Sequence, residues 1–249
     1  MSSLKILGVI PARYASTRFP AKALIPINGV TMIRRVYEQA VQAKLVKDIV
    51  VATDHEEIYN HVKDFGGKVV MTDTNHVSGT DRCREALELQ QNEYDFVINI
   101  QGDEPFIQPA QIDLLAESLN QDTEIATLVK KIDNEQTLFN PNTPKVVFNE
   151  QMEAIYFSRQ TIPFLRGVPV DDWLQKHAFY KHIGIYAYRK DILKAITKLK
   201  PSKLEMVESL EQLRWLEHGY KIQVKETPYE TIGIDTPDDL LKVKSLSGL

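Results

Sequence analysis

Short apolar runs alternate with amphipathic stretches through the first half of the chain, and this pattern predicts a succession of strands and helices. The apolar runs are nearly continuous and rich in Val and Ile, as expected of strands buried on both faces of a parallel sheet. The stretches between them carry apolar residues at helical spacing. The predicted order is βαβαβαβ, with strands at 5–10, 48–53, 68–72 and 95–101 and helices at 31–43, 56–65 and 81–90.

The pattern changes near residue 140. The segments "PKVVF", "EAIYFSR" and "HIGIYAYR" alternate as antiparallel strands do, around a Pro-rich excursion, so we predict an antiparallel insertion over about 140–189. A helix is expected over 203–218, then the strand "KIQVKE", and finally a strand that runs into a closing helix within "ETIGIDTPDDLLKV". On the helix over 203–218, an apolar arc should lie opposite a solvent-facing polar set, which consists of Glu205, Glu208, Glu211 and Gln212.

These elements together predict an α/β fold. We expect a mostly parallel, doubly wound sheet of the nucleotide-binding kind with an antiparallel insertion subdomain. The 249 residues are enough for one large domain, so a single domain over 1–249 that contains the insertion is the expected organisation.

Composition narrows the possible partners and compartment. The 30 Lys and Arg residues stand against 34 Asp and Glu, and the net charge of −4 argues against general attraction to nucleic acid or to an anionic membrane. Cys83 is the single cysteine, which excludes an internal disulfide and fits a reducing compartment. No apolar stretch approaches the roughly 18 residues of a membrane span, and the first residues do not resemble a signal peptide. We therefore expect a cytoplasmic protein with no membrane insertion.

Three polar loops leave the carboxyl ends of predicted strands, where ligands of parallel sheets gather: "PARYASTRFPAK", "ATDHEE" and "QGDEP". The first loop carries Arg13, Arg18 and Lys22 among small residues, an arrangement that suits a triphosphate. The alternative is a solvated surface loop. Because the chain has neither a P-loop motif nor a G-x-G-x-x-G after the first strand, phosphate binding would depend on these side chains.

Two acidic residues follow predicted strands. Asp103 lies in "INIQGDEP" and Asp235 in "IGIDTPDD". Carboxylates at neighbouring strand ends can share Mg²⁺, which takes hard oxygen ligands together with substrate phosphates. The alternatives are a turn or capping aspartate for Asp103 and a helix-initiating aspartate for Asp235.

Nine segments in order resemble the successive motifs of the 3-deoxy-D-manno-octulosonate (Kdo) cytidylyltransferases, the CMP-Kdo synthetases of bacteria that make lipopolysaccharide. The resemblance covers about residues 4–243, and the core of that family is similar to the wider sugar-nucleotide pyrophosphorylases. The segments are "IPARYASTRFPAK", "ATDHEEI", "SGTDR", "NIQGDEP", "FNPNTPKVV", "YFSRQTIP", "HIGIYAY", "LEQLRWLEHG" and "IDTPDDL".

The resemblance implies an Mg²⁺-dependent nucleotidyltransferase. The anomeric hydroxyl of Kdo, an acidic eight-carbon sugar, would attack the α-phosphorus of CTP, giving CMP-Kdo for lipopolysaccharide biosynthesis and pyrophosphate. It also implies a homodimer. The insertion supports pairing through its own surface, because it is rich in apolar and aromatic residues, namely Phe148, Ile155, Tyr156, Phe157, Ile162, Phe164 and Trp173.

The resemblance also assigns site residues. The catalytic set is Arg13, Lys22, Asp103 and Asp235, of which the two acids hold the metal ion. The nucleotide site also includes Ala12 and Gln101. The cytosine pocket consists of Ser78, Gly79 and Arg82. The sugar-acid site is Gln101, Arg159, His182, Tyr186, Glu211 and Gln212. Among these, the Arg159 guanidinium suits a carboxylate, and the spacing of His182 and Tyr186 puts both on one face of a strand. The residues alone leave open a solvated arginine and a structural histidine.

Two positions depart from the family pattern. Members usually read Pro-Gly-Lys-Pro-Leu where this chain has "PAKAL", so Ala21 replaces a glycine and Ala23 a proline. If that glycine used a positive φ, Ala21 would strain the loop beside Lys22. Two other functions remain open: the same chemistry on another acidic sugar, such as 8-amino-Kdo or a sialic acid, and a non-catalytic nucleotide-binding module. The presence of both Asp103 and Asp235 speaks against the module, and the number of Mg²⁺ ions stays open.

Overall fold

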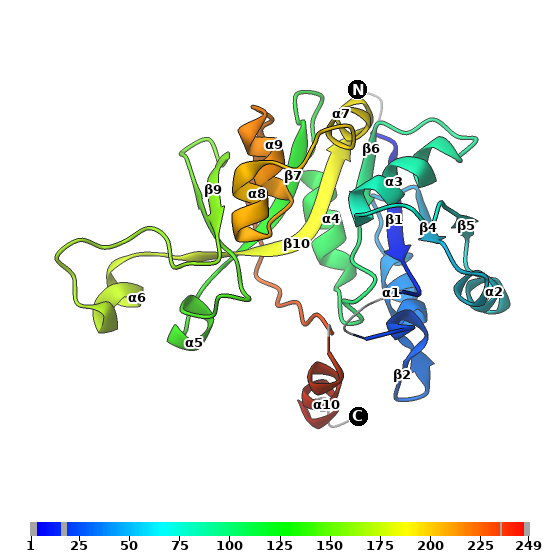
Figure 1. Ribbon diagram of the computed structural model, residues 1–249, viewed down its shortest axis with the longest axis horizontal. Helices are drawn as coiled ribbons and strands as arrows, with labels where there is room; N and C mark the ends of the chain where they lie inside the picture. Colours follow the sequence, from blue (N-terminus) through cyan, green and yellow to red (C-terminus); the bar gives the residue numbers. More distant parts are fainter. Residues whose placement is uncertain (1–3, 16–18, 235, 247–249) are drawn as a thin grey trace. The chain divides into compact units, whose positions relative to one another are not determined.

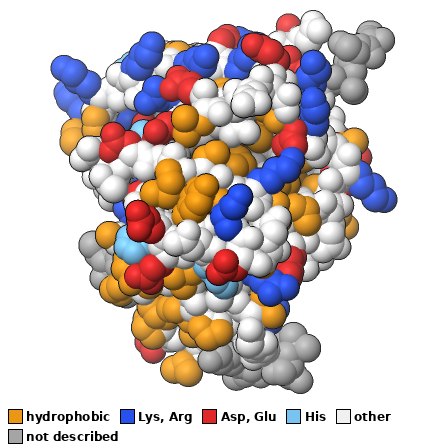
Figure 2. Space-filling view, turned by 90° about the vertical axis from the view of Figure 1, so that its right-hand side faces the viewer, with side chains coloured by type: hydrophobic (Ala, Val, Ile, Leu, Met, Phe, Trp, Pro, Cys, Tyr) orange, Lys and Arg blue, Asp and Glu red, His pale blue; other side chains and the backbone are white. Residues whose placement is uncertain are grey.

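The computed structural model describes residues 4–15, 19–234 and 236–246 (Figure 1). The chain divides into two compact units: unit 1 combines Met1–Glu117 with Thr231–Leu249, and unit 2 is Ser118–Glu230. Within the described ranges, no helix combines the length and the apolar character that crossing a membrane requires. On one face of the molecule, basic and acidic side chains are interspersed with hydrophobic ones (Figure 2).

Unit 1 contains a parallel sheet in the order β6-β1-β4-β5. The strands are β1 (Ile6–Ala12), β4 (Asp48–Thr53), β5 (Val69–Met71) and β6 (Phe96–Asn99), with a small hairpin of β2 (Pro26–Ile27) and β3 (Val30–Thr31). The helices are η1 (Lys22–Leu24), α1 (Met32–Ala40), α2 (Glu56–Asp64), α3 (Gly79–Glu88), α4 (Pro109–Glu117) and α10 (Pro237–Leu246). Each strand and helix predicted in the first half is present, with ends shifted by at most three residues.

Strands β1, β4 and β6 form the core of unit 1, because most of their side chains are buried. Four residues of β1 are at most 3% exposed, namely Ile6, Leu7, Val9 and Ile10. Parallel strands end at the same edge, so the segments after β1, β4, β5 and β6 meet there. The approach is close at Gly102, where an added Cβ would lie 2.7 Å from the carbonyl oxygen of Pro11. That edge carries the three polar loops noted in the sequence.

Unit 2 is mixed. Strand β7 pairs antiparallel with β10 and parallel with β11, and β8 and β9 form an antiparallel pair. The strands are β7 (Ile125–Lys131), β8 (Lys145–Phe148), β9 (Ala154–Ser158), β10 (Tyr180–Arg189) and β11 (Ile222–Glu226). The helices are α5 (Glu135–Leu138), η2 (Val170–Asp172), α6 (Trp173–Lys176), α7 (Lys190–Ile196), α8 (Lys203–Glu208) and α9 (Gln212–Glu217). The predicted α/β class, with a mostly parallel sheet and an antiparallel part, is confirmed. The single domain with an insertion over 140–189 remains a prediction.

Two predicted elements are wrong. The helix expected over 203–218 is broken into α8 and α9 at Ser209, whose φ of 51° ends α8. The expected faces fail with it: Met206 and Val207, which belong to the expected apolar arc, are 63% and 84% exposed, whereas Gln212 of the expected polar set is 5% exposed. The strand expected before the closing helix is also absent from 231–234, where the backbone N–H of Ile234 donates instead to the carbonyl oxygen of Asp103 at 2.9 Å.

Candidate functional site

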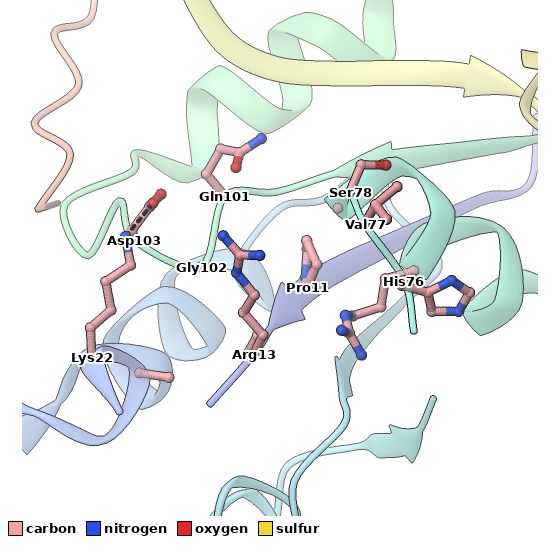
Figure 3. A pocket seen from close by; sticks show the side chains of 13 residues that line it. Pro11, Arg13, Lys22, His76, Val77, Ser78, Gln101, Gly102 and Asp103 are labelled. Atoms are coloured by element: carbon pink, nitrogen blue, oxygen red, sulfur yellow. Dashed lines mark hydrogen bonds and ion pairs between the residues drawn. The ribbon is translucent and has the colours of Figure 1, made fainter. Parts of the chain in front are cut away.

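A cavity of about 290 Å³ opens in unit 1 at the carboxyl ends of β1 and β6, beside the N-terminus of α3 (Figure 3). It brings together every described residue that the resemblance assigned to the nucleotide, namely Ala12, Arg13, Lys22, Ser78, Gly79, Arg82 and Gln101, together with the expected metal ligand Asp103. Arg18 and Asp235 lie outside the described residues.

Lys22 and Asp103 form an ion pair in this cavity. Lys22 Nζ lies 2.7 Å from Asp103 Oδ2, and the two side chains are 17% and 29% exposed. Lys22 is fixed by the short helix η1, and Asp103 by the turn that follows β6. Arg13 is exposed and lines the same cavity. A ligand carrying several negative charges would therefore meet two cations and one carboxylate.

The donor set for a metal ion centres on Asp103. Among the described residues, no group of three His, Cys, Asp or Glu side chains could hold a metal. Mg²⁺ commonly keeps waters and substrate phosphates with one or two protein carboxylates, so such a group is not required. The bond from Ile234 N–H to the Asp103 carbonyl brings the segment that precedes residue 235 to this acid. A hard carboxylate in an open cavity that also suits phosphate fits Mg²⁺.

Glu104, the neighbour of Asp103, is buried. It is 8% exposed, and Oε2 has no hydrogen-bond partner among the described residues. Burial, with a smaller contribution from the charge of Asp103, raises the pKa of Glu104 to about 8. Glu104 is therefore neutral at pH 7, which leaves Asp103 as the charged member of this acidic pair.

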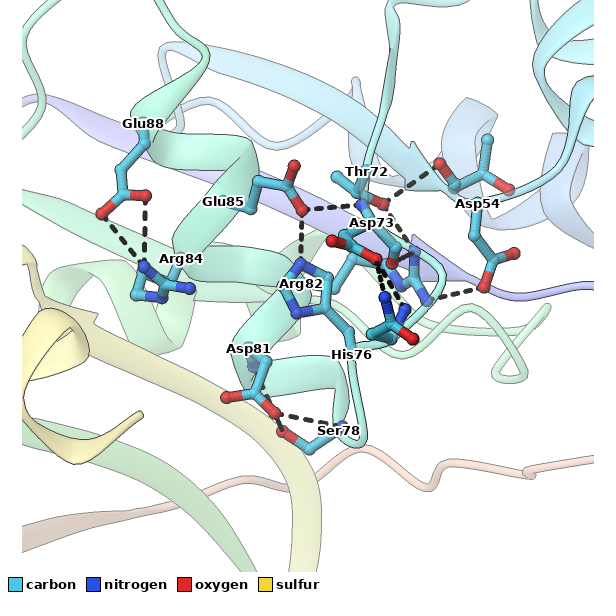
Figure 4. A network of polar contacts seen from close by, with 12 residues as sticks. Asp54, Thr72, Asp73, His76, Ser78, Asp81, Arg82, Arg84, Glu85 and Glu88 are labelled. Carbon is cyan, nitrogen blue, oxygen red and sulfur yellow. Dashed lines mark hydrogen bonds and ion pairs between the residues drawn. The ribbon is translucent and has the colours of Figure 1, made fainter. Parts of the chain in front are cut away.

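Arg82 lines the cavity, and residues of two other segments hold it in place rather than leaving it in solvent (Figure 4). It is 3% exposed and donates to Thr72 Oγ1 at 2.5 Å and to Asp54 Oδ2 at 2.8 Å. The other oxygen of Asp54 accepts from the backbone N–H of Tyr14 at 3.3 Å. The predicted contact of Arg82 with cytosine stays a prediction, while its hydrogen bonds give it a structural task.

The N-terminus of α3 forms another wall. Ser78 caps the helix, and Ser78 and Asp81 form a reciprocal capping box. The preceding segment is held by Glu85, whose Oε2 contacts His76 Nε2 and accepts from Asp73 N at 2.8 Å. His76 and Val77 line the cavity although the sequence did not single them out. Their position directly before the N-cap of a helix at the ligand edge was the available signal.

The loop beside Lys22 carries the strain that the family pattern suggested. Ala21 has φ 53° and ψ 23°, in the left-handed region, and its N–H donates to the carbonyl oxygen of Tyr14 at 3.0 Å. An alanine there costs roughly 1–2 kcal/mol. Lys22 nevertheless reaches Asp103, so the substitution leaves the ion pair in place.

Unit 2 holds the other predicted sugar residues. Arg159 is engaged by the backbone: Nε donates to the Glu208 carbonyl at 2.6 Å, Nη1 to Pro141 at 3.1 Å and Nη2 to Ser209 at 3.1 Å. A guanidinium has five N–H groups, so one on each terminal nitrogen remains for a ligand. The bonds to residues 208 and 209 also explain why the predicted helix breaks there.

Lys145 contacts the backbone of Arg159. It is 0% exposed, and its Nζ donates to the carbonyl oxygens of Asn140, Thr143 and Arg159 at 2.8–2.9 Å. Burial lowers the pKa of this lysine, and the positive charge of Arg159 lowers it further. Three carbonyls satisfy the three donors of the ammonium, so Lys145 ties the segment around residue 140 to the end of β9.

His182 and Tyr186 lie side by side on β10, with ring centroids 5.1 Å apart, which confirms the predicted common face. Burial lowers the pKa of His182 to about 3. It raises the pKa of Tyr186 well above its ordinary value, and the negative charge of Glu211 adds to that effect. Gln212, the first residue of α9, is buried, contrary to the solvent-facing position expected for it.

The predicted residues therefore fall into two groups. The nucleotide group, which includes Gln101, lines one cavity in unit 1. The remaining sugar group, Arg159, His182, Tyr186, Glu211 and Gln212, belongs to unit 2.

Known proteins resemble this chain over nearly its whole length. The family model described as cytidylyltransferase matches residues 7–222. A 3-deoxy-manno-octulosonate cytidylyltransferase of Cytophaga hutchinsonii is 60% identical over 247 residues, 99% of this chain and 99% of the relative. One of the same name from Parabacteroides distasonis is 57% identical and covers 96% of each chain. A solved CMP:2-keto-3-deoxy-manno-octonic acid synthetase complexed with CTP has a TM-score of 0.89 and 42% identity, over 98% of each chain.

Proposed function

Because the chain belongs to the cytidylyltransferase family, we propose that it transfers CMP from CTP to the anomeric hydroxyl of Kdo, giving CMP-Kdo and pyrophosphate. The observation that carries this proposal is the cavity of unit 1, which gathers Arg13, Lys22 and Asp103 at the ligand edge of a parallel sheet. In the reaction the sugar oxygen forms a bond to the α-phosphorus, and the bond from that phosphorus to the bridging oxygen of pyrophosphate breaks.

The side chains of the cavity act by alignment and by charge. Lys22 and Arg13 bind phosphate oxygens and offset the charge that develops on the leaving pyrophosphate. Ser78 and Gly79 place the N-terminus of α3 beside the nucleotide, where the helix dipole favours anions. We assign Asp103 and Asp235 as the residues that would hold Mg²⁺, which supplies further charge neutralisation when bound.

The sugar acid requires a carboxylate partner and several hydroxyl partners. Arg159 supplies the cation, since one N–H remains on each of its terminal nitrogens. Within unit 2, His182, Tyr186, Glu211 and Gln212 supply hydrogen bonds. A substrate panel tests this assignment: pyrophosphate release is followed with CTP and Kdo, 8-amino-Kdo or a sialic acid. Release with Kdo as the best acceptor supports the proposal, release with another acid transfers it to that sugar, and CTP binding without release indicates a binding module.

We also propose a homodimer that pairs through unit 2. Phe157 and Trp173 are 0% and 5% exposed and pack inside the unit, whereas Ile155 and Phe164 are 60% and 74% exposed. A self-complementary patch around these two side chains would remove apolar surface from water. Light scattering measures the mass of the unmodified protein and of Ile155→Glu and Phe164→Glu. A monomeric mass for the unmodified protein rejects the dimer. Dimers in both glutamate variants place the interface elsewhere.

The expected setting is the cytoplasm, where CTP is made, and the expected product use is lipopolysaccharide biosynthesis. A cell fraction assay locates the activity. Loss of Kdo-containing lipopolysaccharide on depletion of the protein would support the pathway, and unchanged lipopolysaccharide would count against it.

A further inference from the structure

The pairing of β10, which carries His182, with its neighbour β7 is irregular close to this histidine. In the pairing of β7 with β10, Leu128 is opposite Ile183 but Thr127 is opposite Tyr186, so the register shifts between these positions. Thr127 is 0% exposed and lies at this shift. Its hydroxyl oxygen is 2.7 Å from the carbonyl oxygen of Ile185, 3.1 Å from that of Ile183 and 3.1 Å from His182 Nε2. A single hydroxyl thus serves three neighbours.

The chemistry of these neighbours decides where the protons lie. A hydroxyl has one proton to donate and lone pairs with which to accept, whereas a carbonyl oxygen only accepts. The Thr127 proton therefore points to the carbonyls, with the shortest distance to Ile185. The contact with His182 is then a hydrogen bond only if Nε2 carries a proton and donates it. In the opposite tautomer the hydroxyl would have to turn to Nε2, and both carbonyls would lose its proton.

We propose that Thr127 is a positioning residue that fixes His182 as the Nε2–H tautomer and so presents Nδ1 as an acceptor to a hydroxyl of the sugar acid. This inference rests on the proposed function, in which His182 contacts the sugar. In the part of the chain that the structure describes, the ring of His182 forms its one hydrogen bond at Nε2. Nδ1 is the remaining nitrogen for a ligand.

The surroundings of the ring agree with this role. The ring of Phe157 stands against it edge to face, at 5.2 Å and 84°, and the ring of Tyr186 lies 5.1 Å away on the same strand. These contacts hold the plane of the imidazole. Burial keeps His182 neutral at pH 7, since its pKa is about 3. A neutral ring is no counter-ion for the sugar carboxylate, so it selects a hydroxyl and leaves the carboxylate to Arg159.

Thr127→Val tests the inference because it removes the hydroxyl and keeps the shape, and Thr127→Ser keeps the hydroxyl. Thr197→Val is the matched control: Thr197 also donates to a backbone carbonyl in unit 2, that of Leu193 at 3.0 Å, but at the C-cap of α7. Long-range proton–nitrogen NMR spectra of the protein with isotope-labelled histidine report the tautomer without substrate. His182→Asn identifies the signal among the six histidines.

We expect His182 to carry its proton on Nε2 in the unmodified protein, in Thr127→Ser and in Thr197→Val, and to lose this preference in Thr127→Val. The KM for the sugar should rise about tenfold in Thr127→Val, with the KM for CTP within about twofold. A proton on Nδ1 in the unmodified protein overturns the inference, as does an unchanged sugar KM in a folded Thr127→Val variant.

The two readouts separate this inference from the proposed function. If no acceptor in the panel supports turnover, the proposed function fails, while the tautomer still tests Thr127. If Thr127→Val does not fold, as judged by circular dichroism, the tautomer of the unmodified protein and the sugar KM of Thr127→Ser decide. An Nδ1–H ring, or a serine variant as impaired as His182→Asn, would reject the role of the hydroxyl.

Discussion

The cavity of unit 1 and the Lys145–Arg159 cluster of unit 2 use the same kinds of side chain in different ways. In the cavity, Lys22 and Asp103 pair with each other at a partly exposed position, where a charged ligand can compete for both. In the cluster, the donors of Lys145 are bound to three backbone carbonyls, and its side chain is fully buried. The comparison teaches that exposure and partner together distinguish the roles: a partly exposed charge paired with another side chain can be exchanged, whereas a buried one whose donors are all taken by carbonyls is structural.

The largest effect is expected at the exchangeable pair. Asp103→Asn should lower turnover by about a thousandfold, because an amide lacks the charge needed to hold a metal ion beside the α-phosphate. The free energy of unfolding should change by less than about 1 kcal/mol, since the ion pair is partly exposed. Pyrophosphate release and urea denaturation measure the two quantities. Substantial Mg²⁺-dependent turnover in a folded variant would remove Asp103 from the metal site.

The structural cation should show the opposite balance. Lys145→Met removes the donor of three carbonyls and should lower the free energy of unfolding by about 3 kcal/mol, with CTP affinity unchanged. Lys194→Met, at an exposed position of α7, is the control and should change stability by less than about 0.5 kcal/mol. Urea denaturation and CTP titration measure the effects. Equal stability of the two variants would erase the distinction between the cluster and the cavity.

His182 sharpens the comparison through pH. Its folded-state pKa of about 3 lies below the ordinary value of 6.5, so between these values the unfolded chain binds the extra proton. The stabilisation that comes from keeping this ring neutral in the folded state is therefore present above pH 6.5 and is lost as the pH falls toward 3. Between pH 7 and 5 the unmodified protein should lose about 1–2 kcal/mol more than His182→Asn, which does not titrate. Denaturation at several pH values checks this, and parallel curves would show that the ring is not desolvated.

The smallest effect concerns the loop that carries Lys22. Ala21→Gly should raise the free energy of unfolding by about 0.5–1 kcal/mol, because glycine adopts the observed φ of 53° without strain. Asn28→Gly is the matched control, since Asn28 has φ 50° but asparagine tolerates this region. Thermal denaturation should show a larger gain for Ala21→Gly. An equal gain at both positions would mean that Ala21 carries no special strain.

The contrast between the units also explains what the sequence could predict. In the first half of the chain, each predicted strand is an apolar run, and the predicted helices, now α1, α2 and α3, bury apolar residues at helical spacing, so local pattern and tertiary structure agree there. Strand β7 was not predicted, although the apolar run within "EIATLVKK" lies between turn residues, Asn120 and Asp122 before it and Asp133 and Asn134 after it. The break at Ser209 was missed because its cause is distant in sequence: Arg159 binds the carbonyls of residues 208 and 209 from β9.

The candidate site divides in the same way. Arg13, Lys22 and Asp103 could be predicted because strand ends of parallel sheets meet at one edge, whereas Ala12, Ser78, Gly79 and Arg82 came from the family resemblance alone. The roles of Arg82 and Lys145 could not be predicted, because hydrogen bonds to Asp54 or to backbone carbonyls leave no trace in residue spacing. The role of Thr127 could not be predicted for the same reason, since a buried threonine in a strand is ordinary.

The last segment of unit 1, which begins at Thr231, is synthesised after all of unit 2. The buried side chain of Ile234 packs with Ile27 and Met32, and its N–H meets the carbonyl of Asp103. During synthesis, the 113 residues of unit 2, from 118 to 230, leave the ribosome before this segment does. A nascent chain therefore contains the residues that line the cavity well before it contains Ile234, whose backbone N–H bonds to Asp103. Completion of the site is tied to completion of translation, so truncated chains carry an unfinished site.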